Sequence, residues 1–173
     1  MGELTKSFEF DAAHRIMDEK IKCFNLHGHR FRIDLTLSYK DIMPIGYAVD
    51  FKLMKVLFGD WVDRYLDHAC IANPMDKDIV DLCTKKDWRL YKMGFGVHRY
   101  VNPTAENLCS ELFCIAGVFF DNENVEVTKV RVYETPTCFV ELTQPMYYLS
   151  DLSKSMLKDW AQNKLQAFSN LGK

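Results

Sequence analysis

The sequence lacks a charge excess of either sign and any long apolar run. Its 173 residues include 22 basic and 24 acidic side chains, so the formal net charge is only −2. This balance gives no basic surface for holding nucleic acid or an anionic membrane. No uncharged run is longer than nine residues, and the first ten residues contain no apolar stretch of signal-peptide length. We therefore expect no nucleic-acid partner, no membrane partner and no secretion.

Paired cysteine motifs are also missing. The six cysteines are scattered without a CxxC pair, and in a chain without an export signal this pattern indicates reduced thiols in the cytoplasm. A chain of this length that is 48% apolar can bury a core without disulfides or a structural metal. A GxGxxG fingerprint is absent too, so no nicotinamide cofactor is indicated. We expect one cytoplasmic domain.

Hydrophobic periodicity indicates an α+β fold with an antiparallel sheet. Four segments have strand patterns: 3–10, 29–39, 125–133 and 137–143. Three segments have helix patterns that follow capping residues: 51–66 after Asp50, the segment from Thr104, and the segment after Ser150-Asp151. The stretch from Asp11 to Phe24 is expected to be irregular, and residues 74–101 are expected to form a long connection or insertion.

Three of the five histidines, His14, His27 and His29, fall within sixteen positions. The two imidazoles of the HGH run are two residues apart, so at the start of a strand they project from the same face. Their Nε2 atoms can converge on one ion, and His14 from the neighbouring segment completes a set of three. Three imidazoles with an open fourth position are typical of catalytic Zn²⁺. The alternative is a surface pair, with His14 in the core.

Cys23 lies four residues before His27 and is open to two interpretations. As a fourth ligand its sulfur would close the zinc site and make that site structural. As a free thiol beside a cation it would have a lowered pKa and serve as a base. The spacing does not choose between them.

One Asp-His pair and two glutamates each have both a functional and an ordinary explanation. Asp67 can orient His68 and raise its basicity, although polar residues are also common where a helix ends. Glu106 falls in the first turn of a predicted helix, where the helix dipole favours a carboxylate. Glu134 ends a predicted strand, where it is either solvated or able to hold a guanidine-like edge with two hydrogen bonds.

Six short motifs occur in one order along the chain. They are Phe10-Asp11-Ala12-Ala13-His14, Cys23-Phe24-Asn25-Leu26-His27-Gly28-His29, Asp50-Phe51, Leu66-Asp67-His68, Pro103-Thr104-Ala105-Glu106-Asn107 and Tyr133-Glu134-Thr135. Taken together, they resemble the 6-pyruvoyltetrahydropterin synthase and 6-carboxytetrahydropterin synthase family over about residues 4–142.

The resemblance implies the tunnelling fold. In that fold a four-stranded antiparallel sheet carries two helices on one face, and subunits join into an oligomeric barrel, typically a homohexamer with sites between subunits. Residues 1–144, with the long connection 74–101, would form this pterin synthase domain. Residues 145–173 would be a C-terminal helical extension.

The resemblance also implies roles for individual residues. Zinc would be bound by His14, His27 and His29, and Glu106 would anchor the pterin beside Thr104, a second substrate-binding residue. The proton-transfer set would be Cys23, Asp67, His68 and Glu134.

The implied substrate is 7,8-dihydroneopterin triphosphate, whose ring reduction is an internal redox rearrangement driven by proton movement. Three residues separate Cys23 from the HGH run, as in the carboxy-forming enzymes of 7-deazaguanine and queuosine biosynthesis. We therefore expect 6-carboxy-5,6,7,8-tetrahydropterin, with release of acetaldehyde and triphosphate. The alternative is the pyruvoyl-forming reaction of tetrahydrobiopterin synthesis, in which triphosphate is eliminated. Residues that hold the triphosphate are not assigned, although four basic residues lie near the proposed metal: Arg15, Lys22, Arg30 and Arg32.

Two other classes of protein compete with this interpretation. A non-enzymatic binding module would use Cys23 and the three histidines as a closed structural zinc site. A cupin would use the same HxH pattern with a third histidine and Asp34, but the predicted helices interrupt its β-barrel.

Overall fold

Two long antiparallel strands form the centre of the sheet. The structure, a computed structural model, describes residues 1–20, 22–95 and 99–170. β1 (Gly2–His14) pairs with β2 (His27–Tyr39) in register from Gly2↔Tyr39 to His14↔His27. The expectation that the first strand ends at residue 10 is wrong. β1 continues through Asp11, Ala12 and Ala13 because pairing with β2 outweighs their weak strand propensity.

The sheet has six strands in the order β4-β3-β1-β2-β5-β6. β5 (Val125–Thr135) and β6 (Cys138–Leu142) extend it antiparallel beyond β2, so the predicted antiparallel run is present. β3 (Ala69–Ala72) and β4 (Leu90–Lys92) add two parallel strands beside β1. The prediction of a four-stranded sheet is therefore incomplete, because β3 and β4 are too short to show a period of two. A single sheet covered by helices also excludes the cupin barrel.

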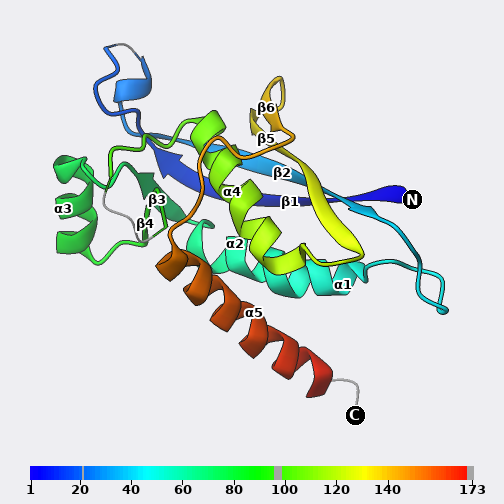
Figure 1. Ribbon diagram of the computed structural model, residues 1–173. Helices are drawn as coiled ribbons and strands as arrows, with labels where there is room; N and C mark the ends of the chain where they lie inside the picture. Colours follow the sequence, from blue (N-terminus) through cyan, green and yellow to red (C-terminus); the bar gives the residue numbers. More distant parts are fainter. Residues whose placement is uncertain (21, 96–98, 171–173) are drawn as a thin grey trace.

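Helices cover one face of this sheet (Figure 1). The predicted helix over 51–66 is a run of α1 (Phe51–Met54), the π-helical segment η2 (Lys55–Gly59) and α2 (Asp60–Tyr65). α4 (Ala105–Phe120) lies beside this run on the same face. Both starts are capped as expected, because the side chains of Asp50 and Thr104 accept the backbone N–H groups of Lys52 and Asn107.

The core lies between this face and the helices. Phe10 and Phe31 stack across β1 and β2 with ring centroids 5.0 Å apart. The largest fully buried side chains come from β2, the α1–α2 run, β3, α4 and the segment after β4: Phe31, Ile33, Leu35, Leu37, Met54, Leu57, Phe58, Trp61, Leu66, Ile71, Met93 and Leu108. One apolar layer therefore fixes the sheet to the helices and holds the ends of β1 and β2 in place.

Residues 74–101 are not a structureless connection. They contain α3 (Lys77–Lys86), which Asp76 caps, and β4. α3 ends at Asp87, which has a left-handed backbone with φ of 54°. Residues 96–98 of this stretch lie outside the described part. The insertion thus extends the sheet and places one helix beside the end of β1 (Figure 1).

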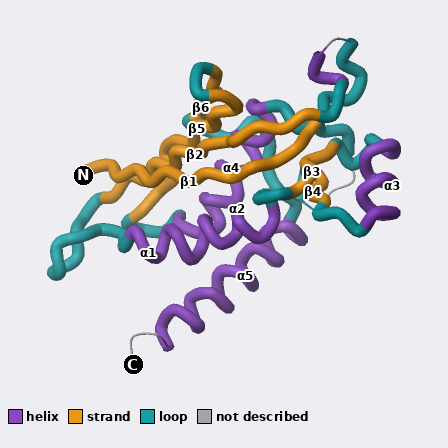
Figure 2. The backbone as a smooth tube through the Cα atoms, turned by 180° about the vertical axis from the view of Figure 1, so that it is seen from behind, coloured by secondary structure: helices purple, strands orange, loops and turns teal. Residues whose placement is uncertain are grey.

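α5 (Asp151–Asn170) packs beyond the first helical layer, away from the sheet, as the opposite view shows (Figure 2). The Oγ of Ser150 accepts the backbone N–H of Ser153, so the expected cap is present. Trp160 Nε1 donates to the carbonyl of Leu57 at 3.1 Å, and Lys164 Nζ lies 2.6 Å from Asp60 Oδ2. Among the described residues, no helix combines the length and apolar character needed to cross a membrane.

Candidate functional site

Three imidazoles meet at the paired ends of β1 and β2. His14 is opposite His27, and His29 is opposite Ala12. The ring centroids of the three histidines are separated by 4.6, 5.0 and 5.3 Å. One ligand nitrogen from each ring lies within 4.8 Å of the others. The expected convergence of the HGH histidines with His14 is present, and strand alternation causes it.

Hydrogen bonds on two of the rings leave the second nitrogen of each ring available to a metal. His14 Nδ1 donates to the carbonyl of Pro103 at 2.8 Å, and His27 Nδ1 donates to that of Asn25 at 2.7 Å. His14 Nε2 is buried and has no hydrogen-bond partner. A backbone partner on one nitrogen fixes the tautomer in which the other is a ligand. This donor set fits a divalent metal such as Zn²⁺.

The protonation of His14 favours the same role. Burial lowers the pKa of His14, and the neighbouring His27 and His29 lower it further, whereas the Pro103 carbonyl and Glu134 act in the opposite direction. The ring is therefore held in the neutral form that binds metals.

Gly28 separates the two histidines of β2 for a steric reason. A Cβ at this position would lie 3.1 Å from the backbone carbonyl oxygen of Ala12. Glycine therefore allows β1 and β2 to approach closely at the point where the three imidazoles meet.

Glu134 lies on the same face as the histidines. Its Oε1 is 3.4 Å from His14 Nε2, and 31% of its side chain is exposed. It lines a cavity of about 430 Å³ together with His29, Arg32 and Tyr133. The carboxylate therefore faces both the imidazoles and a space into which a small molecule can enter.

Asp67 and His68 form the expected pair. His68 Nδ1 donates to Asp67 Oδ2 at 2.6 Å, and Asp67 Oδ1 accepts the backbone N–H of Asp11 at 3.0 Å. His68 has a φ of 56° and a side chain that is 74% exposed. The carboxylate is thus fixed on β1 and orients an imidazole whose Nε2 is open to solvent.

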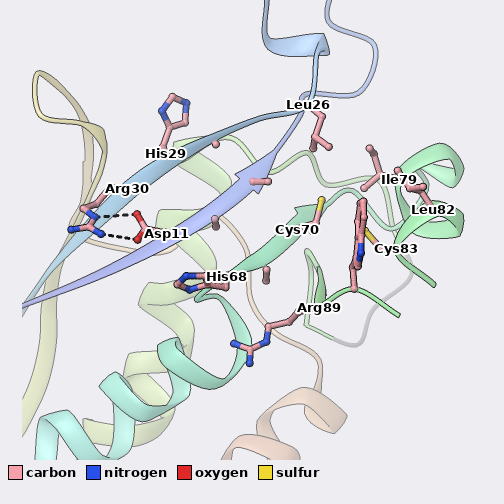
Figure 3. A pocket seen from close by; sticks show the side chains of 15 residues that line it. Asp11, Leu26, His29, Arg30, His68, Cys70, Ile79, Leu82, Cys83 and Arg89 are labelled. Atoms are coloured by element: carbon pink, nitrogen blue, oxygen red, sulfur yellow. Dashed lines mark hydrogen bonds and ion pairs between the residues drawn. The ribbon is translucent and has the colours of Figure 1, made fainter. Parts of the chain in front are cut away.

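The metal-site histidines and the Asp11–Arg30 ion pair occupy different faces of the β1–β2 pair. The metal-site histidines share the face of Phe10 and Phe31, whereas Asp11 and Arg30 point from the opposite face and form an ion pair at 2.7 Å. His68 lies beside this ion pair. It lines the same cavity as His29, but Figure 3 shows that the two imidazoles do not point toward one another. His68 is not part of the metal-binding group found among the described residues.

The remaining predicted residues lie nearer the surface. Cys23 is exposed in η1 (Lys22–Phe24), a short 3-10 helix, and its sulfur is not part of the metal-binding group found among the described residues. Thr104 caps α4 and lines a polar cavity, and Glu106 is exposed in the first turn of this helix. Neither lines the cavities beside His29 and His68.

The structure adds groups that the sequence did not reveal. The Pro103 carbonyl accepts a hydrogen bond from His14, which lies 89 positions away in the sequence. Asp76 accepts one from Arg15, which lies 61 positions away. A second cavity, of about 570 Å³, lies beside His68 and is bounded by Trp88, Arg89 and α3 (Figure 3). The insertion supplies these walls of the cavity. The unusual length of residues 74–101 was therefore the only sign of them in the sequence.

Comparisons with known proteins agree with this geometry. The profile described as 6-pyruvoyl tetrahydropterin synthase matches residues 3–145. Two curated relatives are 6-carboxy-5,6,7,8-tetrahydropterin synthases. The one from Rickettsia bellii is 37% identical over 144 residues, with 82% of this chain and 100% of the relative covered. The one from Rickettsia conorii is 36% identical over 146 residues, with the same coverage.

A solved structure has a similar fold. The 6-pyruvoyl tetrahydropterin synthase of Caenorhabditis elegans aligns with a TM-score of 0.56 at 24% identity, covering 82% of this chain and 94% of that chain. The matched profile spans most of the chain and the curated relatives match over their whole length, so this protein belongs to the 6-pyruvoyl tetrahydropterin synthase family.

Proposed function

We propose that this protein converts 7,8-dihydroneopterin triphosphate to 6-carboxy-5,6,7,8-tetrahydropterin. The observation that carries the proposal is the group of three imidazoles, with a buried His14 Nε2 that makes no hydrogen bond, in a chain 36–37% identical to synthases of that name. The three-residue spacing between Cys23 and the HGH run supports the carboxy-forming reaction. The pyruvoyl-forming reaction is the second candidate, because the matching profile and the C. elegans structure have that name.

His14, His27 and His29 would hold Zn²⁺. When bound there, the ion acts as a Lewis acid that acidifies hydroxyl and neighbouring C–H groups of the substrate side chain. The backbone carbonyls of Pro103 and Asn25 keep two of the rings in the tautomer that this role requires.

Proton transfer would be shared between side chains of the protein. The Cys23 thiolate removes a proton from the substrate side chain, and His68 returns one through Nε2 while Asp67 holds its Nδ1. Glu134 belongs to the same relay beside His14, and Glu106 anchors the pterin, with Thr104 beside it. The rearrangement consumes one water molecule and releases acetaldehyde and triphosphate.

The complete site would form between chains. Because the rings of His68 and His29 in one chain do not point toward one another, and His68 is not part of the metal-binding group, we propose that His68 of one subunit serves the metal site of another. A homohexameric barrel supplies such interfaces. Residues 1–144 would form the catalytic unit, and residues 145–173 a helical extension that packs on it through α5.

One assay tests the proposal. The zinc-loaded protein is incubated with 7,8-dihydroneopterin triphosphate, and the products are identified by mass. Formation of 6-carboxytetrahydropterin and acetaldehyde supports the proposal, and a 6-pyruvoyl product without acetaldehyde selects the second candidate. An unchanged substrate overturns both, provided that zinc is bound. His27→Ala is the matched control because it removes one ligand and leaves Cys23, His68 and Glu134 in place.

A further inference from the structure

An almost buried ion pair joins the insertion to the segment after β1. Arg15 Nε donates to Asp76 Oδ2 at 2.6 Å, and Arg15 Nη2 donates to Asp76 Oδ1 at 2.5 Å. The side chains of Arg15 and Asp76 are only 13% and 3% exposed. Asp76 also caps α3 through the backbone N–H of Ile79. Two parallel bonds in this geometry fix the plane of the guanidinium as well as its position.

The fixed guanidinium contacts the residue next to Cys23. Arg15 Cζ lies 4.9 Å from the centroid of the Phe24 ring, a distance at which the cation and the ring face attract each other. The backbone N–H of the next residue, Ile16, donates to the carbonyl of Cys23 at 2.8 Å. Arg15 and its neighbour therefore hold both Cys23 and Phe24.

The position of Cys23 depends on these contacts. None of the residues of η1 is buried, so apolar packing does not hold this short helix. Figure 1 shows the segment projecting beyond the ends of β1 and β2, at the same end of the sheet as α3. The contacts with Arg15 and Ile16 fix η1 relative to β1, on which His14 lies.

We infer that Arg15 and Asp76 are positioning residues that use the inserted helix α3 to hold Cys23 at the working distance from the substrate. The inference rests on the proposed function of Cys23 as a base. Neither residue touches the reacting atoms. Asp76 at the start of α3 instead fixes the Arg15 guanidinium, and this guanidinium contacts Phe24 of η1. The insertion thereby has a role in catalysis. A displacement of about 1 Å in a catalytic group lowers the rate about 10²-fold.

Two variants test whether the Arg15–Asp76 ion pair positions η1, and another variant on the same helix is the control. Arg15→Lys keeps the positive charge but loses the planar fork, and Asp76→Asn keeps the size but loses the carboxylate. Asp81→Asn changes an exposed carboxylate of α3 and is the matched control. The measurements are kcat, KM, zinc content, amide hydrogen exchange over residues 22–25, and the rate at which iodoacetamide alkylates Cys23, read by peptide mass spectrometry.

We expect kcat to fall about 10- to 100-fold in Arg15→Lys and Asp76→Asn, with KM and zinc content unchanged. Amide exchange over residues 22–25 should become faster, the alkylation rate of Cys23 should change, and Asp81→Asn should match the wild type. The inference is overturned if exchange and alkylation stay at wild-type values in both variants. It is also overturned if kcat falls only in proportion to the fraction of unfolded protein.

A third variant guards against loss of folding. Phe24 is 43% exposed, so Phe24→Leu should fold normally while removing the ring face from Arg15. It should reproduce the faster amide exchange and part of the loss of kcat. Wild-type exchange and kcat in this variant would contradict the positioning role of Arg15. Full activity in Cys23→Ala would instead refute the proposed base. In that case exchange and alkylation still report whether Arg15 and Asp76 hold η1.

Discussion

His14 and His27 each use one ring nitrogen for a backbone carbonyl, which leaves the other for a metal. We expect about one zinc per chain, bound by three histidine nitrogens. His27→Ala should lose zinc and activity together, as measured by metal analysis and product formation. X-ray absorption should show no sulfur neighbour. A sulfur at about 2.3 Å in the resting protein would make Cys23 a ligand and restore the structural-site interpretation.

Removal of zinc by a chelator extends the same test. The core between the sheet and helices contains no part of the histidine group except His14, so the apo protein should stay folded and lose only activity. Cooperative unfolding on chelation, followed by circular dichroism, would instead indicate a structural site.

Cys23 is exposed and outside the histidine group, as a base that meets its substrate from solvent should be. Cys23→Ala should therefore retain zinc and assembly while losing about 10²- to 10⁴-fold in rate. Single-turnover kinetics on the zinc-loaded variant measure the loss. Wild-type turnover in this variant would eliminate the thiolate as the base.

Glu106 and Glu134 occupy different environments, so their glutamine variants should behave differently. In Glu106→Gln an acceptor is replaced by a donor, which should weaken pterin binding by about 1–3 kcal/mol if Glu106 holds paired donors of the ring. Glu134 contacts His14, so Glu134→Gln should lower turnover more than affinity. Calorimetry and steady-state kinetics measure both effects. If affinity collapses only in Glu134→Gln, the two roles are exchanged, and if neither variant differs from wild type, the pterin assignment fails.

A site residue could be predicted from the sequence when its contacts are with residues close to it in the chain. The HGH pair needs only strand alternation, and Asp67 contacts the residue next to it, so both arrangements were visible in the sequence. The partners of His14 and Arg15 lie 89 and 61 positions away. No local period specifies such contacts, because they depend on how distant segments of the chain pack against the end of β1.

At the level of elements, length and periodicity decided which predictions succeeded. The long strand β2 and the helix α4 show a clear period and were predicted, whereas β3, with four residues, and β4, with three, show none. The parallel edge of the sheet was missed for this reason. β1 was predicted too short because its polar and small residues gain their strand conformation from β2 rather than from their own propensity.

Glu111 joins α4 to β4, to the turn after β4 and to the segment before α5, and it should make stability depend on pH. Its buried carboxylate on α4 accepts the hydroxyl of Tyr91 on β4, the backbone N–H of Gly94 at 2.7 Å and the hydroxyl of Tyr147 at 3.1 Å. Burial raises the pKa of Glu111 above its usual 4.5, against the lowering effect of these three donors and of Arg99. The folded protein therefore keeps this proton over a range of pH in which the unfolded chain has lost it.

The sign of the effect follows from proton linkage. Because the native state binds more protons than the unfolded state, the contribution of Glu111 to the unfolding free energy falls as pH rises from about 4.5 through the folded pKa. Urea denaturation between about pH 4 and 7 should show this fall in the wild type and in the exposed control Glu123→Gln. Glu111→Gln should lack it. Identical slopes in wild type and Glu111→Gln would contradict the prediction.

At the scale of the whole molecule, His68 is not part of the metal-binding group of its own chain, so the proposed site takes its groups from two chains. This arrangement predicts complementation between inactive variants. His27→Ala lacks a metal ligand and His68→Ala lacks the proposed proton donor, and each should be inactive alone. In an oligomer assembled from equal amounts of both, a site that takes its metal from one chain and His68 from the other is intact in about a quarter of cases.

The mixture should therefore recover about a quarter of wild-type activity when its subunits exchange. Co-purification of two differently tagged variants, followed by native mass spectrometry, confirms mixing before the product is measured.

A mixture of His27→Ala with Cys23→Ala is the informative control. Cys23 and the metal ligands lie on adjacent segments of one chain, at the same end of β1 and β2. If both sets of groups serve the site from one subunit, this second pair cannot complement. Recovery in the first mixture alone supports a site shared between chains, whereas no recovery in a verified mixed oligomer would place the complete proton relay within a single chain.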